Sequence, residues 1–383
     1  MSPSSSDGRL TLEQVLARLE PILEGVIAPH AEAVDREGRF PAETVAALGE
    51  AGLLGLVTPT EHGGLGLGVV EAAQVVHHIA RSCGSSGMVI CMHFCGALVI
   101  AAAGDAETNR AIARGEHLST LAFSEAGSRS HFWAPLSTAT DETDGVRLDA
   151  QKSWVTSAGV ATAIVWSSRP LAAEGASTLW LVPSSTPGLR VVGAYDGLGL
   201  RGNASAPVVA DGARVPHAAR LGADGAGFDL MMGVVLPCFN ACSAGVSLGL
   251  MEAICARSAA WCAGTRHTHL GSALADLPTI RGYLARMRIQ TDMARGLWLD
   301  TLQAIAAGRP DTMLRVLEVK AAAGESALEV AALGMRVCGG AAYRREVGVE
   351  RLFRDAQAAS VMAPTTDVLY DFIGKAVTGL PLF

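Results

Sequence analysis

A histidine in an apolar segment and two pairs of cysteines are residues of this chain whose types and spacing suit chemistry. His93 is a candidate general base, because histidine titrates nearest to neutral pH. A lone histidine on an apolar helix is, however, more often a packed structural residue. Cys91/Cys95 and Cys238/Cys242 are spaced i, i+4, as paired metal ligands can be, but no further matching pair follows at a usable spacing. We therefore expect buried free thiols and no metal.

The composition limits the class of protein. Of the 383 residues 50% are hydrophobic and 17% are charged, and the net charge is −7 with scattered basic residues, so we expect no nucleic-acid partner. A membrane span needs roughly 18 uninterrupted apolar residues. The longest candidate, Met88 to Gly104, contains His93 and several small residues, so we expect no span. Residues 1–8 lack a basic region followed by an apolar core, which predicts no signal peptide and a cytoplasmic protein.

The hydrophobic period changes twice along the chain. Helical spacing in the first part gives way to short β-type runs separated by turn residues, and then returns. This order predicts an α+β fold with helical, β and helical domains at residues 1–115, 116–225 and 226–383. The expected strands are 119–124, 147–150, 163–168, 178–182 and 189–192. The expected C-terminal helices are 229–263, 273–307, 311–338 and 349–378.

Local motifs then occur in an order that resembles one known family. Residues 121–128, Leu-Ala-Phe-Ser-Glu-Ala-Gly-Ser, resemble a Thr-Glu-Pro-Gly-x-Gly-Ser-Asp loop with two residues deleted. Residues 152–159, Lys-Ser-Trp-Val-Thr-Ser-Ala-Gly, resemble a Lys-x-Trp-Ile-Thr-Asn-Gly strand. Residues 336–340 and 350–355 resemble Gln-x-x-Gly-Gly and Arg-Asp segments. Together these motifs are similar to those of the FAD-dependent acyl-CoA dehydrogenase superfamily over essentially the whole chain.

The resemblance implies a fold and a set of flavin contacts. The fold would be an N-terminal helical domain, a central β-barrel or sandwich and a C-terminal four-helix bundle, in a homotetramer or homodimer. In the β-domain, Ser124 would bond the pyrimidine edge of the flavin and Trp154 would pack beside the isoalloxazine. Thr156 would donate to flavin N5, where reduction builds electron density. Ser128 is implied in substrate binding.

The resemblance also implies cofactor contacts in the C-terminal domain. Arg266 matches an arginine that reaches the pyrophosphate of a FAD in the adjoining subunit, a role that suits a guanidinium. Gly339 and Gly340 would let a backbone approach the FAD diphosphate. Thr365 is a further expected cofactor contact.

The residue that the family uses as its catalytic base is missing. In the family a glutamate removes the α-proton of an acyl thioester, and the matching position here is Ala363. Some members carry this glutamate on the first helix of the bundle, which matches Phe239. The base is therefore relocated or the reaction needs none. The candidates for a relocated base are His93 and, more weakly, Glu252, Asp367 and Tyr370.

The sequence indicates a flavin-dependent oxidoreductase of CH–CH groups that acts on an atypical acyl thioester. The thioester would be carried by CoA or by a carrier protein, as in specialised metabolism. The alternatives are a flavin-dependent monooxygenase of the same fold and a non-catalytic FAD-binding paralogue. The acyl group and the electron acceptor stay open.

Overall fold

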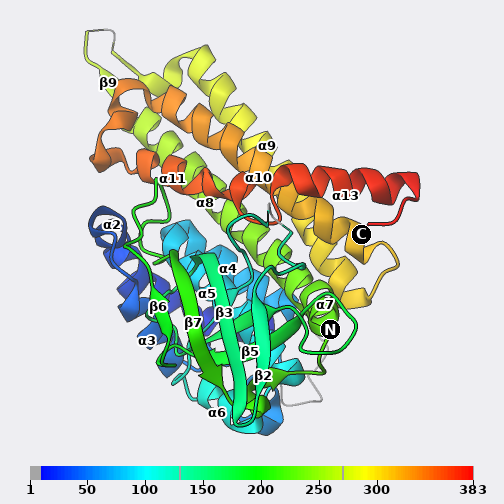
Figure 1. Ribbon diagram of the computed structural model, residues 1–383. Helices are drawn as coiled ribbons and strands as arrows, with labels where there is room; N and C mark the ends of the chain where they lie inside the picture. Colours follow the sequence, from blue (N-terminus) through cyan, green and yellow to red (C-terminus); the bar gives the residue numbers. More distant parts are fainter. Residues whose placement is uncertain (1–9, 129–130, 270, 383) are drawn as a thin grey trace.

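The computed structural model describes residues 10–128, 131–269 and 271–382, so the leader at residues 1–8 lies outside the described residues. Helices form the first part of the chain, strands the middle and helices the end (Figure 1). This confirms the predicted α+β class with its helical, β and helical parts.

The N-terminal helices are amphipathic except for α5 (Gly84–Ala103), which is buried along most of its length. It packs against α4, β1 and the long helix α8 (Leu236–Gly264) and therefore has almost no solvent face. The first helix begins at Thr11, whose Oγ1 accepts a hydrogen bond from the N–H of Gln14 (3.3 Å). The other helices of this part are α1 (Leu12–Ile22), α2 (Ala28–Glu37), α3 (Ala42–Glu50), α4 (Val69–Ser82) and α6 (Ala106–Ala113).

Two four-stranded sheets form the middle of the chain, with strand orders β1-β4-β5-β8 and β2-β3-β7-β6. Trp166 and Trp180 are opposite each other in neighbouring strands, both fully buried. They share one core with Val146 and Val208 of the second sheet, so the two sheets pack as a sandwich. The strands are β1 (Ser119–Ala122), β2 (Thr138–Glu142), β3 (Gly145–Val155), β4 (Ala163–Ser168), β5 (Thr178–Pro183), β6 (Leu189–Val191), β7 (Ala206–Val215) and β8 (Arg220–Leu221).

The predicted strand segments are present, but β2, β7 and the two-residue β8 were not predicted from the sequence. β2 is a largely exposed strand at the edge of its sheet, so it has no apolar face to recognise. β7 contains Pro207 and Asp211-Gly212, which are typical of turns. Pairing with β3 on one side and β6 on the other overrides these local preferences.

The C-terminal part contains three long helices, α8, α9 (Pro278–Ala307) and α10 (Thr312–Cys338), which pack on one another. A short helix, α7 (Gly227–Leu230), leads into α8. The predicted fourth helix at 349–378 is wrong in its continuity. It is divided into α11 (Val349–Ala356), α12 (Ala358–Val361) and α13 (Thr366–Thr378), with a turn at residues 362–365. The predicted domain divisions at 115/116 and 225/226 fall between α6 and β1 and between β8 and α7.

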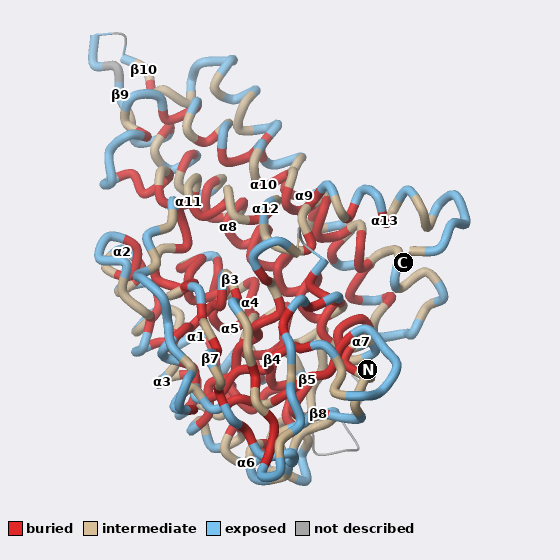
Figure 2. The backbone as a smooth tube through the Cα atoms, viewed as in Figure 1, coloured by how far each residue is buried: buried red, intermediate tan, exposed pale blue. Residues whose placement is uncertain are grey.

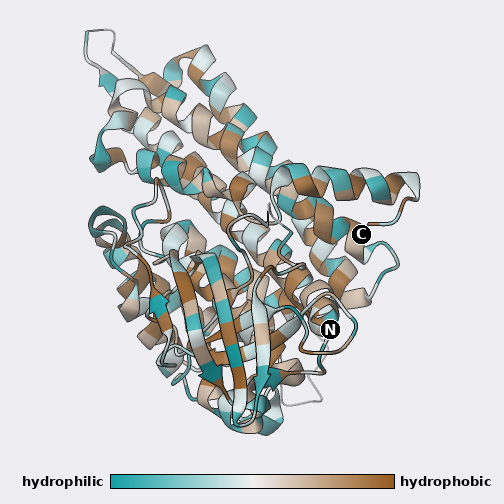
Figure 3. Ribbon diagram, viewed as in Figure 1, coloured by the Kyte–Doolittle hydropathy of each residue, from teal (hydrophilic) through white to brown (hydrophobic). Residues whose placement is uncertain are grey.

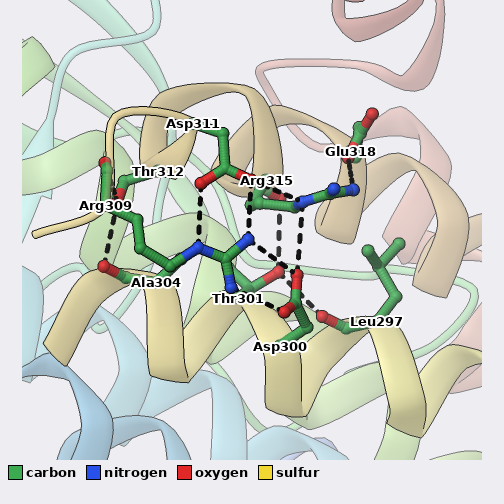
Figure 4. A network of polar contacts seen from close by, with 9 residues as sticks. All are labelled: Leu297, Asp300, Thr301, Ala304, Arg309, Asp311, Thr312, Arg315 and Glu318. Carbon is green, nitrogen blue, oxygen red and sulfur yellow. Dashed lines mark hydrogen bonds and ion pairs between the residues drawn. The ribbon is translucent and has the colours of Figure 1, made fainter. Parts of the chain in front are cut away.

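A network of ion pairs holds the turn between α9 and α10 (Figure 4). Arg309 donates to Asp300 (2.7 Å) on α9 and to Asp311 (2.6 Å) just before α10. Arg315 donates to Asp311 (3.2 Å) and to Glu318 (2.9 Å). A single ion pair that is this exposed contributes little to the stability of the fold. Here the pairs share carboxylates, so they form one network across both helices.

Two helices are long and apolar enough to cross a membrane by length and composition: α5 and the continuous stretch Gly227–Gly264. In the most apolar part of α5, 72% of the residues are buried inside the structure, and in that of Gly227–Gly264, 89% are buried. Figures 2 and 3 show the same helices as buried and largely hydrophobic at the centre of the molecule. They are therefore core helices of this fold, and as evidence for a membrane span they are weak.

Asp35 and Arg354 connect three parts of the chain. Arg354 on α11 forms a two-pronged pair with Asp35 on α2 (2.8 and 2.6 Å) and donates to the carbonyl of Leu198 (3.1 Å). Next to it, the carboxylate of Asp355 accepts the N–H of Leu200 (2.6 Å). The segment that follows β6 is therefore fixed between the N-terminal and C-terminal helices.

Candidate functional site

A cavity of about 690 Å³ opens between the sandwich and the helices. One wall is polar and comes from the β-region, with Ser124, Trp154, Thr156, Asn203 and Ser205 among its residues. Thr156 and Ser205 share a hydroxyl–hydroxyl hydrogen bond (3.0 Å). The side-chain oxygen of Asn203 is buried and has no hydrogen-bond partner among the described residues. This wall therefore presents polar groups that a bound molecule can pair with.

The opposite wall is apolar and comes from helices. Met88 and Met92 of α5, Phe239 of α8 and the segment Val361–Pro364 line it. Ala363 and Phe239, the two positions where the resemblance places a glutamate, therefore both lie at the cavity. Neither side chain can accept a proton.

Trp154 is 70% exposed although it belongs to a strand of the sandwich, and it lines the cavity. Its φ is +56°, in the left-handed region that non-glycine residues rarely adopt. The other non-glycine residues with positive φ are Ser157 (+59°), Leu200 (+48°) and Ala204 (+49°) among those described. All four line the cavity or lie within two residues of one that does. Strained backbone of this kind is typical of ligand sites, where the surrounding structure enforces it.

Glu125 is a carboxylate at the cavity that the sequence analysis did not consider as a base. Lys152 donates to Glu125 Oε1 (2.5 Å), and the backbone N–H groups of Leu136 (2.5 Å) and Ser137 (3.1 Å) donate to Oε2. Burial alone raises the pKa of Glu125, but the charge and hydrogen bond of Lys152 lower it below its usual value. Both oxygens are thus occupied, so Glu125 is a structural carboxylate that holds the loop after β1.

Lys152 completes this buried group. Its ammonium also donates to Ser167 O (2.7 Å) and Ser167 Oγ (2.9 Å) on β4. Burial lowers the pKa of Lys152 to about 8, and the charge of Glu125 opposes that shift. At neutral pH the amine is therefore still largely protonated, and the pair joins the loop that carries Ser124 to the strand that carries Trp154.

The candidate base His93 does not lie at the cavity, and this corrects the sequence interpretation. It is fully buried, its Nε2 is hydrogen bonded to Leu54 O (2.9 Å), and its Nδ1 accepts the N–H of Ser119 (3.1 Å). Burial lowers its pKa to about 4. Both ring nitrogens are used to join α5 to β1 and to the turn after α3, so no nitrogen is left for a substrate proton.

The weaker candidates are also placed elsewhere. Glu252 on α8 pairs with His77 (3.1 Å), Arg81 (3.3 Å) and Arg295, which accounts for its carboxylate. Asp367 and Tyr370 lie on the exposed side of α13 and do not line the cavity. The structure therefore provides no free carboxylate or imidazole among the described residues of the cavity wall.

The expected cofactor residues divide into two groups. Ser124, Trp154, Thr156 and the expected substrate contact Ser128 line the cavity. Thr365 directly follows the cavity wall, as the residue before α13. The second group of expected contacts is remote from it.

Arg266, Gly339 and Gly340 are exposed and lie just beyond the far ends of α8 and α10. From Phe239 to the end of α8 the helix runs roughly 35–40 Å at 1.5 Å per residue. These residues therefore do not touch the cavity of their own chain, and a cofactor that they contact would belong to a neighbouring subunit.

The two cysteine pairs, which appeared unrelated in the sequence, are each other's neighbours in the structure. Cys91 interacts with Cys242 as well as with Cys95, and Cys238 with Cys95 as well as with Cys242, at a Sγ–Sγ distance of 4.0 Å in the last pair. All four are buried free thiols. No group of three or more His, Cys, Asp or Glu in the described part of the chain is arranged to hold a metal ion.

Comparison with known proteins agrees with this architecture. The profile of the acyl-CoA dehydrogenase N-terminal domain matches residues 11–115, that of the middle domain matches 120–213, and that of the C-terminal domain matches 225–378. This chain belongs to the acyl-CoA dehydrogenase family. Its fold is thus the acyl-CoA dehydrogenase fold, and the predicted family is confirmed.

Individual relatives extend over nearly the whole chain. It is 29% identical over 373 residues to the probable acyl-CoA dehydrogenase YngJ of Bacillus subtilis. The aligned region covers 94% of this chain and 96% of YngJ. It is 30% identical over 349 residues to the L-prolyl-(peptidyl-carrier protein) dehydrogenase of Pseudomonas fluorescens, covering 88% and 90%. The structure of a glutaryl-coenzyme A dehydrogenase in complex with glutaryl-CoA matches with a TM-score of 0.90 and 25% identity, covering 100% and 98%.

Proposed function

We propose that this acyl-CoA dehydrogenase family member is a FAD-dependent oxidoreductase of an atypical acyl thioester, and that its reaction uses no carboxylate of the protein as the α-proton base. The observation that carries this proposal is the cavity wall. Ala363 and Phe239 occupy the two base positions, and Glu125, the one carboxylate among the described residues that line the cavity, is bound by Lys152. Binding groups are thus present where the expected base is absent.

The polar wall fits a flavin. Trp154 presents a large exposed ring to the cavity, and the hydroxyls of Ser124 and Thr156 lie on the same wall. The buried oxygen of Asn203 still has an open acceptor position. When bound, FAD supplies an acceptor for hydride. The protein would hold the flavin with Ser124, Trp154 and Thr156, exclude water through its apolar wall and orient the acyl chain along that wall.

The substrate class follows from the relatives and from the apolar wall. Relatives act on CoA thioesters or on a prolyl group of a peptidyl carrier protein. An acyl or aminoacyl thioester on CoA or on a carrier protein, as in specialised metabolism, suits the cavity of this chain. Ser128, which lines the cavity, is the residue that we assign to substrate binding.

The deciding experiment is anaerobic mixing of the purified holoprotein with a panel of acyl-CoA, acyl-carrier-protein and amine compounds. Bleaching of the visible flavin absorbance without oxygen supports a dehydrogenase. A flavin that reacts only when an external reductant and oxygen are supplied would instead support the second candidate, a monooxygenase of the same fold, which the missing base also favours. A protein that binds no flavin would refute both.

A further inference from the structure

Lys320 on α10 is a buried lysine behind the apolar wall of the cavity, and burial lowers its pKa to about 7. Only 2% of the residue is exposed, and the hydrogen-bond partners of its Nζ among the described residues are all backbone carbonyls. A buried ammonium without a carboxylate partner is costly unless hydrogen bonds replace its water shell. Its surroundings must therefore supply acceptors.

The acceptors all come from one short segment. The Lys320 ammonium donates to the backbone oxygens of Ala359 (3.2 Å), Met362 (3.0 Å) and Pro364 (2.8 Å). An ammonium has three N–H donors, so all three are used. The carbonyls belong to the end of α12 and the turn before α13, where a helix leaves carbonyls unpaired. Lys320 therefore joins three carbonyls of this turn to α10.

The same turn forms the cavity wall at the first vacant base position. Met362, Ala363 and Pro364 line the cavity, and two of them place their carbonyls on Lys320. The second vacant position is also in contact, because the ammonium lies 5.9 Å from the ring centre of Phe239, within the range of a cation–π interaction. Lys320 thus lies behind both positions at once.

We infer that Lys320 is a positioning residue that sets the shape of the acyl end of the cavity by anchoring the 359–364 turn and the Phe239 ring. It does not itself touch the cavity, so it is not a catalytic residue. The inference deepens the proposed function, on which its consequence for substrate binding rests. The anchoring of the turn can be tested independently of any substrate.

The test uses the holoprotein with Lys320→Met, which removes the three donors, and Lys320→Arg, which restores a charged donor. Lys375→Met on α13, where the lysine pairs with Asp371 (2.9 Å), is the control for loss of a lysine nearby. Hydrogen exchange is measured by mass spectrometry in peptides that cover residues 357–366 and, for comparison, β3. We expect exchange in 357–366 to rise at least tenfold in Lys320→Met, less in Lys320→Arg and not in Lys375→Met, with β3 unchanged.

Binding of octanoyl-CoA, followed through the visible flavin spectrum, gives the functional readout. We expect at least tenfold weaker binding in Lys320→Met with an unchanged FAD content, and partial recovery in Lys320→Arg. Exchange in 357–366 within twofold of the wild type in Lys320→Met would overturn the inference, as would loss of the whole fold in both variants. If the wild type itself does not bind octanoyl-CoA, the exchange result alone decides the role of Lys320.

Discussion

At the scale of single residues, the cavity has side chains that can bind a ligand but has no free base among its described residues. The hydroxyls of Ser124 and Thr156 and the ring of Trp154 are present at the polar wall, whereas Ala363 and Phe239 leave the apolar wall without a base. His93 illustrates why residue type alone misleads. Its imidazole is committed to Leu54 and Ser119, and burial lowers its pKa to about 4.

The vacancy at Ala363 leads to a kinetic prediction. With butyryl-CoA or octanoyl-CoA, flavin reduction in the wild type should be about 10²–10⁴-fold slower than in a family member that has the glutamate, because general-base catalysis typically contributes that factor. Ala363→Glu should accelerate the reaction, and Ala363→Gln, of the same size but without a base, should not. Stopped-flow absorbance measures the rates. A wild type that is as fast as such a family member would mean that another group of the protein acts as the base.

A second residue-scale prediction concerns the buried pair of Glu125 and Lys152. Glu125→Gln should lower the free energy of unfolding by about 3–5 kcal/mol, because it leaves a buried ammonium without its counter-charge. Since Lys152 holds the folded pKa of Glu125 below 4.5, the stabilisation is present above pH 4.5 and is lost as the pH falls below it. Scanning calorimetry at pH 7 and at pH 3–4 should therefore show a difference from wild type that shrinks in acid.

The matched control is Glu142→Gln in the same sandwich, where the carboxylate pairs with the exposed Arg214. That change should leave the unfolding transition nearly unmoved. Equal effects of the two substitutions would show that the buried pair of Glu125 and Lys152 stabilises the fold no more than an exposed pair does.

At the scale of elements, short polar contacts decide how the three parts of the chain meet. The two-pronged pair of Arg354 and Asp35 joins α11 to α2, and Arg354 also holds the carbonyl of Leu198 at the edge of the β-region. Because Leu200 lines the cavity close to Leu198, this junction also supports the polar wall.

We predict that Asp35→Asn lowers the free energy of unfolding by about 1–3 kcal/mol and separates the unfolding of the helical parts from that of the sandwich, because Arg354 loses its two-pronged pair on α2 and keeps only Glu350 on its own helix as a charge partner. Chemical denaturation followed by fluorescence and by circular dichroism would show the two transitions diverge. Glu32→Gln on the same helix, whose partner Arg36 is exposed, is the control and should change little. Coincident, unshifted transitions in Asp35→Asn would contradict the prediction.

At the scale of the whole molecule, the expected cofactor contacts do not meet within one chain. Arg266 lies in β9 (Arg266–His267), which Figure 1 shows at the end of the bundle remote from the sandwich, and Gly339 and Gly340 directly follow α10. If they contact FAD, as the family resemblance implies, the site is completed by a second copy of this chain.

The corresponding prediction is an assembly of at least two chains, and we expect a homotetramer or homodimer. Arg266→Ala should reduce FAD retention about tenfold or more without lowering the stability of the sandwich, because it removes a phosphate contact and no core packing. Light scattering gives the mass and absorbance gives the FAD content, with the exposed Arg36→Ala as the control. A monomer that retains its full FAD content would refute this arrangement.

The sequence by itself determined the architecture and several residues of the cavity. Its hydrophobic periods predicted the order of helices and strands, and its motifs predicted that Ser124, Trp154 and Thr156 belong together, as they do at the polar wall. It also predicted the loss of the carboxylate at Ala363. These features are readable because periodicity and local motifs are properties of neighbouring residues.

Only the tertiary structure decided which polar groups are free. The engagement of His93, the pairing of Glu125 with Lys152 and the anchoring of residues 359–364 by Lys320 all join residues far apart in the sequence. The meeting of Cys91/Cys95 with Cys238/Cys242 is of the same kind. Whether a side chain can accept a proton depends on burial and on partners supplied by other elements, and no spacing within one segment contains that information.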